Sequence, residues 1–130
     1  MNKQQSGFTL IELIMVIVIL GALAVTAIPR YVDLQTQADA SALKGVLGTL
    51  SAGSAINYAD CISNAGTCLT GAAMADCSDV ATTVIGGMPA GYTFPAPIAA
   101  LTAGAGSTTN CTVEQTSSGN TDTFVAITPP

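Results

Sequence analysis

Histidine and tryptophan are absent from this chain of 130 residues, and charged residues are scarce. Without histidine, no catalytic triad or general base can rely on an imidazole ring. The chain has 3 Lys or Arg residues against 8 Asp or Glu residues, and its formal net charge is −5. Proteins bind nucleic-acid phosphates through clustered Lys and Arg side chains. The composition therefore excludes imidazole chemistry and gives no support to nucleic-acid binding.

Apolar residues are abundant, at 49% of the chain, but only 5% of the residues are aromatic. Much of the apolar content is alanine, which buries little area per residue. A compact domain of this size already buries only a modest fraction of its surface. We therefore expect the core to depend on disulfides or on neighbouring subunits.

Four cysteines, Cys61, Cys68, Cys77 and Cys111, all lie C-terminal to position 60. An even number in a small exported region indicates two disulfides. A zinc site is disfavoured, because the spacing lacks close Cys-x-x-Cys pairs and histidine is absent. Four cysteines allow three pairings, and the sequence does not choose among them. Our hypothesis is that Cys61 pairs with Cys68 and Cys77 with Cys111.

Residues 8–28 form one continuous apolar run, FTLIELIMVIVILGALAVTAI, whose only charged residue is Glu12. Lys3 precedes the run, and Pro29 and Arg30 follow it. At about 1.5 Å per residue, a helix of this length spans about 30 Å, the thickness of the hydrocarbon core of a bilayer. The pattern predicts a membrane-spanning helix.

Two ordinary explanations of this run are incomplete. A secretory signal peptide would use Lys3 and the small residues at 22–24, but the apolar run continues beyond that point and carries a carboxylate near its start. A plain membrane anchor tolerates one Glu, which costs about 2.5–3.5 kcal/mol against about −0.3 to −0.6 kcal/mol for each Leu, Ile, Val or Phe. That interpretation leaves Glu12 unexplained, because carboxylates inside membranes usually have a function and a partner.

Residues 7–12 (Gly-Phe-Thr-Leu-Ile-Glu) resemble the processing site of type IV pilins and type II secretion pseudopilins, and the resemblance extends to about residue 50. In that family a prepilin peptidase cleaves after the glycine and methylates the new amine. The resemblance implies cleavage between Gly7 and Phe8 and N-methylation of Phe8. It also implies that Glu12 pairs with the Phe8 amine of a neighbouring subunit, which offsets part of the desolvation penalty. Residues 29–35 look most like the mannose-sensitive haemagglutinin type of pilin.

The helical pattern continues beyond Pro29 to about Tyr58. Apolar residues recur at helical spacing, which predicts an amphipathic helix that packs on the C-terminal domain; they are Tyr31, Leu34, Ala38, Ala42, Leu43, Val46, Leu47 and Leu50. Pro29 predicts a kink, and Gly21 is a weak point because glycine costs about 1 kcal/mol relative to alanine in a helix. The resemblance implies local unwinding between Gly21 and Pro29 in a filament, whereas the segment stays helical in lipid.

The remaining residues predict a small sheet. Residues 60–79 are expected to form a loop, and strands are expected at 81–86, 110–115 and 123–128, where β-branched residues concentrate. Turns are expected at 88–91, 104–107 and 118–120, the last closing a hairpin. The predicted fold class is α+β, with a long N-terminal helix (a transmembrane half and an amphipathic half) packed on a small antiparallel sheet. The predicted organisation is a leader at 1–7, a transmembrane and polymerisation helix at 8–29, an amphipathic helix at 30–58 and a disulfide-linked loop and sheet at 59–130.

Asp76 and Asp79, together with Asp60 or Asp122, are the candidate calcium ligands. Their spacing is not that of an EF-hand loop, and aspartate is common in turns, so we favour turn residues and expect no metal or other cofactor. The sequence contains no visible nucleophile and base pair and no Gly-rich phosphate-binding loop. We therefore expect no enzymatic activity and no ATP hydrolysis by this chain.

The expected function is that of a structural subunit of an extracellular filament resembling a type IV pilus, for adhesion, motility or aggregation. The resemblance implies four partners: further copies of the chain, a prepilin peptidase, an inner-membrane assembly platform with an ATPase motor, and the lipid bilayer before assembly. It implies a single-pass inner-membrane protein that becomes extracellular. One alternative is a pseudopilin of a type II secretion system. Another is a soluble secreted binding domain released near Ala24 or Ala27.

Overall fold

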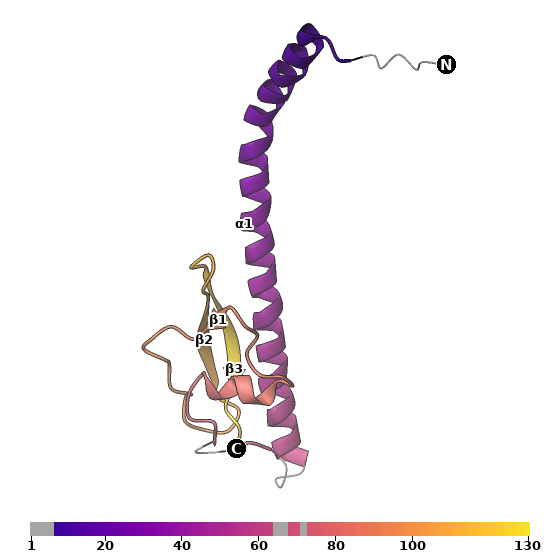
Figure 1. Cartoon of the computed structure of the whole chain (residues 1–130). Coiled ribbons are helices and arrows are strands. Elements are labelled where there is room, and N and C mark those ends of the chain that lie inside the picture. Colours follow the sequence, from indigo (N-terminus) through magenta and orange to yellow (C-terminus); the bar gives the residue numbers. More distant parts are fainter. Residues whose placement is uncertain (1–6, 64–67, 71–72) are drawn as a thin grey trace, which may run out of the picture. The chain divides into compact units, whose positions relative to one another are not determined.

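A computed structural model describes residues 7–63, 68–70 and 73–130, apart from the side chain of Pro29 (Figure 1). The elements in this part of the chain are α1 (Leu10–Ser63), the 3-10 helix η2 (Asp79–Thr83), β1 (Tyr92–Thr93), β2 (Thr108–Gln115) and β3 (Thr121–Ile127). They divide into two units, Met1–Ala38 and Asp39–Pro130, and α1 contributes to both. The second unit therefore contains part of the helix as well as the sheet.

Within the second unit, α1 buries one face. The buried residues recur every three or four positions, as the helical period requires; they are Leu43, Leu47, Leu50, Ser54, Asn57 and Cys61. The predicted apolar stripe is therefore right for the three leucines, but Ala42 is exposed and Val46 is only half-buried. The helix continues to Ser63, beyond the predicted end near Tyr58, because Asn57 and Cys61 extend the buried face by another turn.

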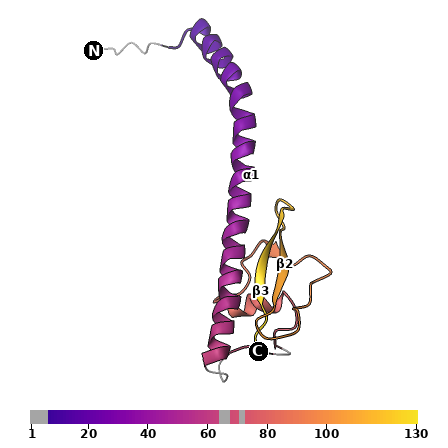
Figure 2. The same cartoon turned by 180° about the vertical axis from the view of Figure 1, so that it is seen from behind.

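The three strands form an antiparallel sheet in the order β1-β2-β3. β2 and β3 are joined by a short turn that contains Gly119 at a φ of 69°, a conformation that glycine adopts without strain. Cys111 lies opposite Phe124 in this hairpin, and both side chains are buried. The predicted hairpin is confirmed. β2 and β3 lie beside α1 both in Figure 1 and in Figure 2, which views the molecule from behind.

The core of the second unit lies between α1 and the sheet. Val113, Phe124 and Ala126 from the strands meet the three leucines of α1, and Met74 and Val80 close the core from the intervening segment. Burying an aliphatic or aromatic side chain of this kind contributes about 1.5–3 kcal/mol. The fold of the second unit therefore rests on contacts between segments far apart in the sequence.

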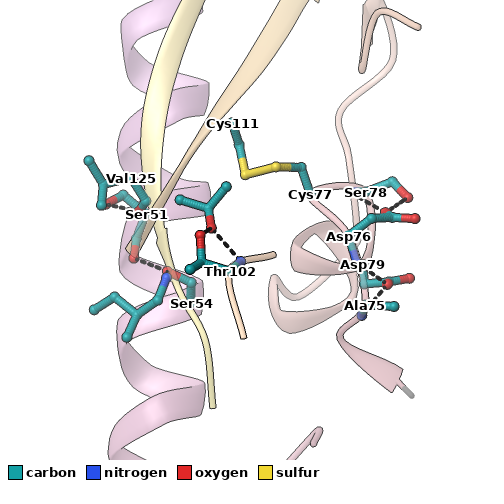
Figure 3. Close-up of a disulfide and its surroundings, with 12 residues drawn as sticks. Ser51, Ser54, Ala75, Asp76, Cys77, Ser78, Asp79, Thr102, Cys111 and Val125 are labelled. Atoms are coloured by element: carbon teal, nitrogen blue, oxygen red, sulfur yellow. Dashed lines mark hydrogen bonds between the residues drawn. A yellow bond between two sulfur atoms is a disulfide. The ribbon is translucent and has the colours of Figure 1, made fainter. Parts of the chain in front are cut away.

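Two serines of α1 form hydrogen bonds with the backbone of β3. The Ser51 hydroxyl donates to the Val125 carbonyl oxygen over 3.2 Å, and the Ile127 N–H donates to Ser54 Oγ over 3.3 Å. Figure 3 shows both serines reaching from α1 toward the strand. Open strand edges can pair with other chains. The helix therefore provides hydrogen-bond partners for two backbone groups of β3, and these bonds hold α1 against the sheet.

The four cysteines form the two disulfides that we expected, Cys61–Cys68 and Cys77–Cys111. The first closes a short segment after α1, and the second links the region before η2 to β2 (Figure 3). Cys77 and Cys111 are fully buried against the core. The second disulfide therefore joins the loop region to the centre of the sheet.

The strand predicted at residues 81–86 is wrong. The structure places η2 over the first part of this range and a turn with Gly86 and Gly87 at positive φ after it. The hydroxyls of Thr82 and Thr83 donate to carbonyl oxygens three residues back, those of Asp79 and Val80, at 2.6 and 2.7 Å. Such local bonds compete with strand pairing. The β-branched composition suggested a strand, but local hydrogen bonding favours the 3-10 helix.

Candidate functional site

The first unit presents an apolar helix with no protein core around it. From position 8 to position 28 every side chain is exposed, including Phe8 at 87% and Leu20 at 59%. α1 is long and apolar enough to cross a membrane, and none of its most apolar window is buried. An exposed apolar surface of this extent marks a membrane or protein interaction site. Of the residues predicted to mediate assembly, Glu12, Gly21 and Pro29 lie on α1, and Phe8 precedes it.

Thr9 and Glu12 form a capping box at the start of α1. Glu12 Oε2 accepts hydrogen bonds from the Thr9 N–H at 2.8 Å and from the Thr9 hydroxyl at 2.7 Å, and the Glu12 N–H donates to Thr9 Oγ1 at 3.4 Å. This reciprocal arrangement satisfies backbone donors that the first turn of a helix cannot satisfy itself. The carboxylate also lies at the positive end of the helix dipole. The geometry therefore gives Glu12 a partner within its own chain.

Our sequence reasoning missed Thr9. The signal was present, because a threonine followed three residues later by glutamate and then by an apolar run is the sequence signature of a capping box. The implied pairing of Glu12 with the Phe8 amine of another subunit is not tested by a single chain.

Gly7 and Phe8 precede the first helical residue, Leu10. Phe8 is exposed, and among the described residues none beyond the chain neighbours of Gly7 comes within 4 Å of the position that a Cβ on Gly7 would occupy. A peptide bond in such an open, non-helical segment is accessible to a protease. The predicted cleavage position is therefore accessible, whereas residues 1–6 of the predicted leader lie outside the described part of the chain.

Gly21 and Pro29 both lie inside α1, which runs through them without interruption. In the described part of the chain, nothing other than the neighbouring helix backbone approaches within 4 Å of the Cβ position of Gly21. Between these two residues, the Thr26 hydroxyl donates to the Leu23 carbonyl oxygen over 2.9 Å. Polar groups in a bilayer must be satisfied internally, and this bond satisfies the hydroxyl. The chain by itself thus keeps the segment helical, and unwinding in a filament stays a prediction.

Asp76 and Asp79 act as turn residues. Asp79 Oδ2 accepts from the N–H groups of Ala75 and Asp76 at 2.8 and 3.0 Å, and Asp76 Oδ1 accepts from the Ser78 N–H at 2.8 Å and from the Ser78 hydroxyl (Figure 3). The side-chain and backbone bonds from Ser78 lower the pKa of Asp76. Among the described residues, no three His, Cys, Asp or Glu side chains come together as a metal site.

Comparison with known proteins supports the assignment made from residues 7–12. The family profile described as "Prokaryotic N-terminal methylation motif" matches residues 2–28. The chain is 44% identical over 51 residues to the type II secretion system core protein G of Pseudomonas aeruginosa. It is 54% identical over 41 residues to the type IV major pilin protein PilE1 of Neisseria gonorrhoeae, and 64% identical over 33 residues to the type IV narrow pilus major component PilA5 of Thermus thermophilus.

These similarities cover part of each protein. They span 39%, 32% and 25% of this chain and 36%, 25% and 28% of the three relatives, respectively. The chain thus spans roughly a third or less of the length of the curated relatives that it matches. No solved structure matches the chain significantly. The family profile covers the methylation motif and the apolar run that follows it.

Proposed function

We propose that this chain, which belongs through its N-terminal segment to the family of type IV pilins and type II secretion pseudopilins, is the structural subunit of an extracellular filament resembling a type IV pilus. One observation carries the proposal: the methylation motif matched at residues 2–28 coincides with an apolar helix whose side chains are all exposed from 8 to 28. Such a surface requires lipid or other copies of the same helix around it. The membrane provides the lipid before assembly, and the filament core provides the other copies of the helix afterwards.

Maturation in this proposal begins at the open segment before α1. A prepilin peptidase removes the leader, residues 1–7, and methylates the amine of Phe8. Methylation keeps the positive charge. The amine can then pair with the Glu12 carboxylate of an adjacent copy, where a low local dielectric strengthens the attraction. A subunit out of register would leave Glu12 without this additional partner, so the pair specifies register as well as adding attraction.

Assembly moves residues 8–29 from lipid into a bundle of like helices, with Gly21 and Pro29 allowing local unwinding. Both environments are apolar, so the transfer changes little hydrophobic free energy. An inner-membrane platform and an ATPase motor supply the directional work, and the chain itself acts as a structural protein and not as an enzyme. It is a single-pass inner-membrane protein before assembly and extracellular afterwards. The amphipathic helix at 30–58 connects this region to the C-terminal sheet.

The first experiment is mass analysis of the mature N-terminus, combined with electron microscopy of the producing cells. The proposal predicts a chain that begins with methylated Phe8 and surface filaments that contain it. A chain that retains residues 1–7 would contradict the proposal. A start at Val25 or Ile28 would instead identify a secreted domain released by a signal peptidase.

A type II secretion pseudopilin is the second candidate. The observation in its favour is the match to the secretion core protein G, which extends over 51 residues, against 41 for the gonococcal pilin. Both candidates predict the same mature N-terminus. Deletion of the gene separates them, because loss of long surface filaments supports the pilus and loss of protein secretion with unchanged surface filaments supports the pseudopilus.

A further inference from the structure

Asn57 is a polar residue on the buried face of α1. It is only 9% exposed, and it continues the line of buried leucines toward Cys61. Asparagine favours a helix less than leucine or alanine does. A buried side-chain amide also lowers stability unless its donor and its acceptor are both hydrogen-bonded. Asn57 at this position therefore requires a partner for both ends of its amide.

That partner is the backbone of Leu69. Asn57 Nδ2 donates to the Leu69 carbonyl oxygen over 2.9 Å, and the Leu69 N–H donates to Asn57 Oδ1 over 2.9 Å. One side chain thus makes the two bonds that a neighbouring strand makes with a residue in an antiparallel ladder. The Leu69 side chain packs against the core of the second unit. We call these two bonds the Asn57–Leu69 clamp.

The Asn57–Leu69 clamp lies beside the first disulfide. Asn57 precedes Cys61 by four residues, which places both on the same face of α1, and Leu69 directly follows Cys68. The Cα atoms of Cys61 and Cys68 are 5.1 Å apart. Holding Leu69 on the helix therefore brings Cys68 next to Cys61. The clamp uses only an amide side chain and a peptide backbone, so both of its bonds can form while the cysteines are reduced.

The clamp distinguishes between the three disulfide pairings that the sequence leaves open. Two cysteines can form a disulfide only when their Cα atoms lie within about 7 Å of each other. In the reduced chain, the clamp keeps Cys68 at Cys61 and away from the other two cysteines, which belong to the core between α1 and the sheet. Cys77 and Cys111 are then left to pair with each other.

We propose that Asn57 is a positioning residue for oxidative folding, which directs Cys61 to Cys68 by holding Leu69 on α1 before the disulfide forms. When oxidised glutathione is the oxidant, the two protein thiols form one disulfide and the glutathione disulfide is reduced to two thiols. Asn57 exchanges no electron or proton in this reaction. It lowers the entropic cost of closing the loop between the two sulfur atoms. The inference concerns the second unit and does not depend on filament assembly.

The first test compares Asn57→Leu with Ser54→Ala in the full-length chain. Each variant is reduced in detergent and then equilibrated with mixtures of reduced and oxidised glutathione. Both substitutions remove a buried polar group from α1, but Ser54 accepts from the Ile127 N–H in β3 and not from Leu69. Asn57→Asp is the intermediate variant, because aspartate keeps an acceptor for the Leu69 N–H and loses the donor.

Cleavage after aspartate and glutamate separates the possible pairings. It leaves both cysteines of the first disulfide in one peptide, 61–76. The cysteines of the second disulfide fall in two other peptides, 77–79 and 80–114. Mass analysis after thiol blocking therefore gives an equilibrium constant against glutathione for each disulfide and reveals mispaired products. The measured quantity is the ratio of the first constant to the second, because a general loss of stability lowers both.

We expect Asn57→Leu to lower this ratio about ten-fold or more, because both bonds of the clamp are lost, and to yield mispaired peptides. Asn57→Asp should give an intermediate ratio, and Ser54→Ala should leave the ratio unchanged. A ratio that stays at the wild-type value in both Asn57 variants would overturn the inference, because Asn57 would then stabilise the fold without directing the pairing.

A second measurement tests whether the clamp forms before the disulfide. In a chain that carries Cys61→Ala and Cys68→Ala, hydrogen exchange of the Leu69 amide should be about ten-fold slower than in the same chain with Asn57→Leu added. The Leu69 amide is the donor in one bond of the clamp, so its exchange reports the clamp directly. Equal exchange in the two chains would show that the disulfide holds the clamp in place, and this result would overturn the inference.

Discussion

Leu20 and Leu50 belong to the same helix, yet Leu20 is 59% exposed and Leu50 is 1% exposed. In the described residues of the first unit, the apolar side chains are exposed and none belongs to a buried core. The second unit buries its leucines against β2 and β3 and adds two disulfides. One part of α1 therefore requires other molecules to cover its apolar side chains, whereas one face of the other part is covered by its own chain. We therefore expect substitutions in the exposed part of α1 to affect assembly and substitutions in the buried part to affect stability.

The largest expected effect is on assembly. Glu12→Ala should reduce filaments about ten-fold or more, because the intersubunit charge pair is lost, while the protein still inserts and the second unit keeps its stability. Asp33→Ala is the matched control, since it removes an acidic residue from α1 outside the apolar run. Electron microscopy and mass analysis of the leader measure both outcomes. Normal filaments from Glu12→Ala would remove the role assigned to this carboxylate.

The next effect concerns the stability of the second unit. Replacing both Cys77 and Cys111 by alanine should lower its free energy of unfolding by about 4 kcal/mol, and replacing Cys61 and Cys68 by about 2 kcal/mol, because the longer loop restricts the unfolded chain more. The sequence separations are 34 and 7 residues. Urea unfolding of the detergent-solubilised chain measures the difference. The reverse order would show that factors other than chain entropy dominate.

A leucine pair tests the contrast directly. Leu50→Ala should lower the free energy of unfolding of the second unit by about 2–5 kcal/mol, because it leaves a cavity in the core. Leu20→Ala should change that free energy by less than about 0.5 kcal/mol, as exposed substitutions do. Both variants can be followed by hydrogen exchange of the amides in β2. Equal effects would mean that the first unit contributes to the core.

The smallest effect depends on pH. Because the hydrogen bonds from Ser78 lower the pKa of Asp76, this group stabilises the folded state above its ordinary unfolded pKa, and the contribution is lost as the pH falls through the lower, folded pKa. Ser78→Ala should therefore flatten the stability profile below about pH 4 and change stability by about 1 kcal/mol or less at neutral pH. Thermal unfolding at pH 3 and pH 7 measures both. A steeper acid dependence in the variant would contradict this role.

Local sequence patterns predicted the elements in which all residues favour the same secondary structure. The apolar run and the leucines of α1 follow the helical period, and β2 and β3 are rich in β-branched residues on either side of a turn, so the helix and the hairpin were predicted. The segment around Thr82 and Thr83 was not, because β-branched residues favour strands while their hydroxyls also stabilise a 3-10 turn. The role of Thr9 was not predicted, although its position three residues before Glu12 is the sequence signature of a capping box. The packing of Thr83 against Gly53 had no sequence signal at all.

The amino-acid sequence alone determined the apolar helix, its single acidic residue and the processing motif, because these depend on composition and spacing within one segment. Only the tertiary structure decided which face of α1 is covered by the chain's own sheet and which is left open. That decision depends on contacts between residues distant in sequence, such as Ser54 with Ile127.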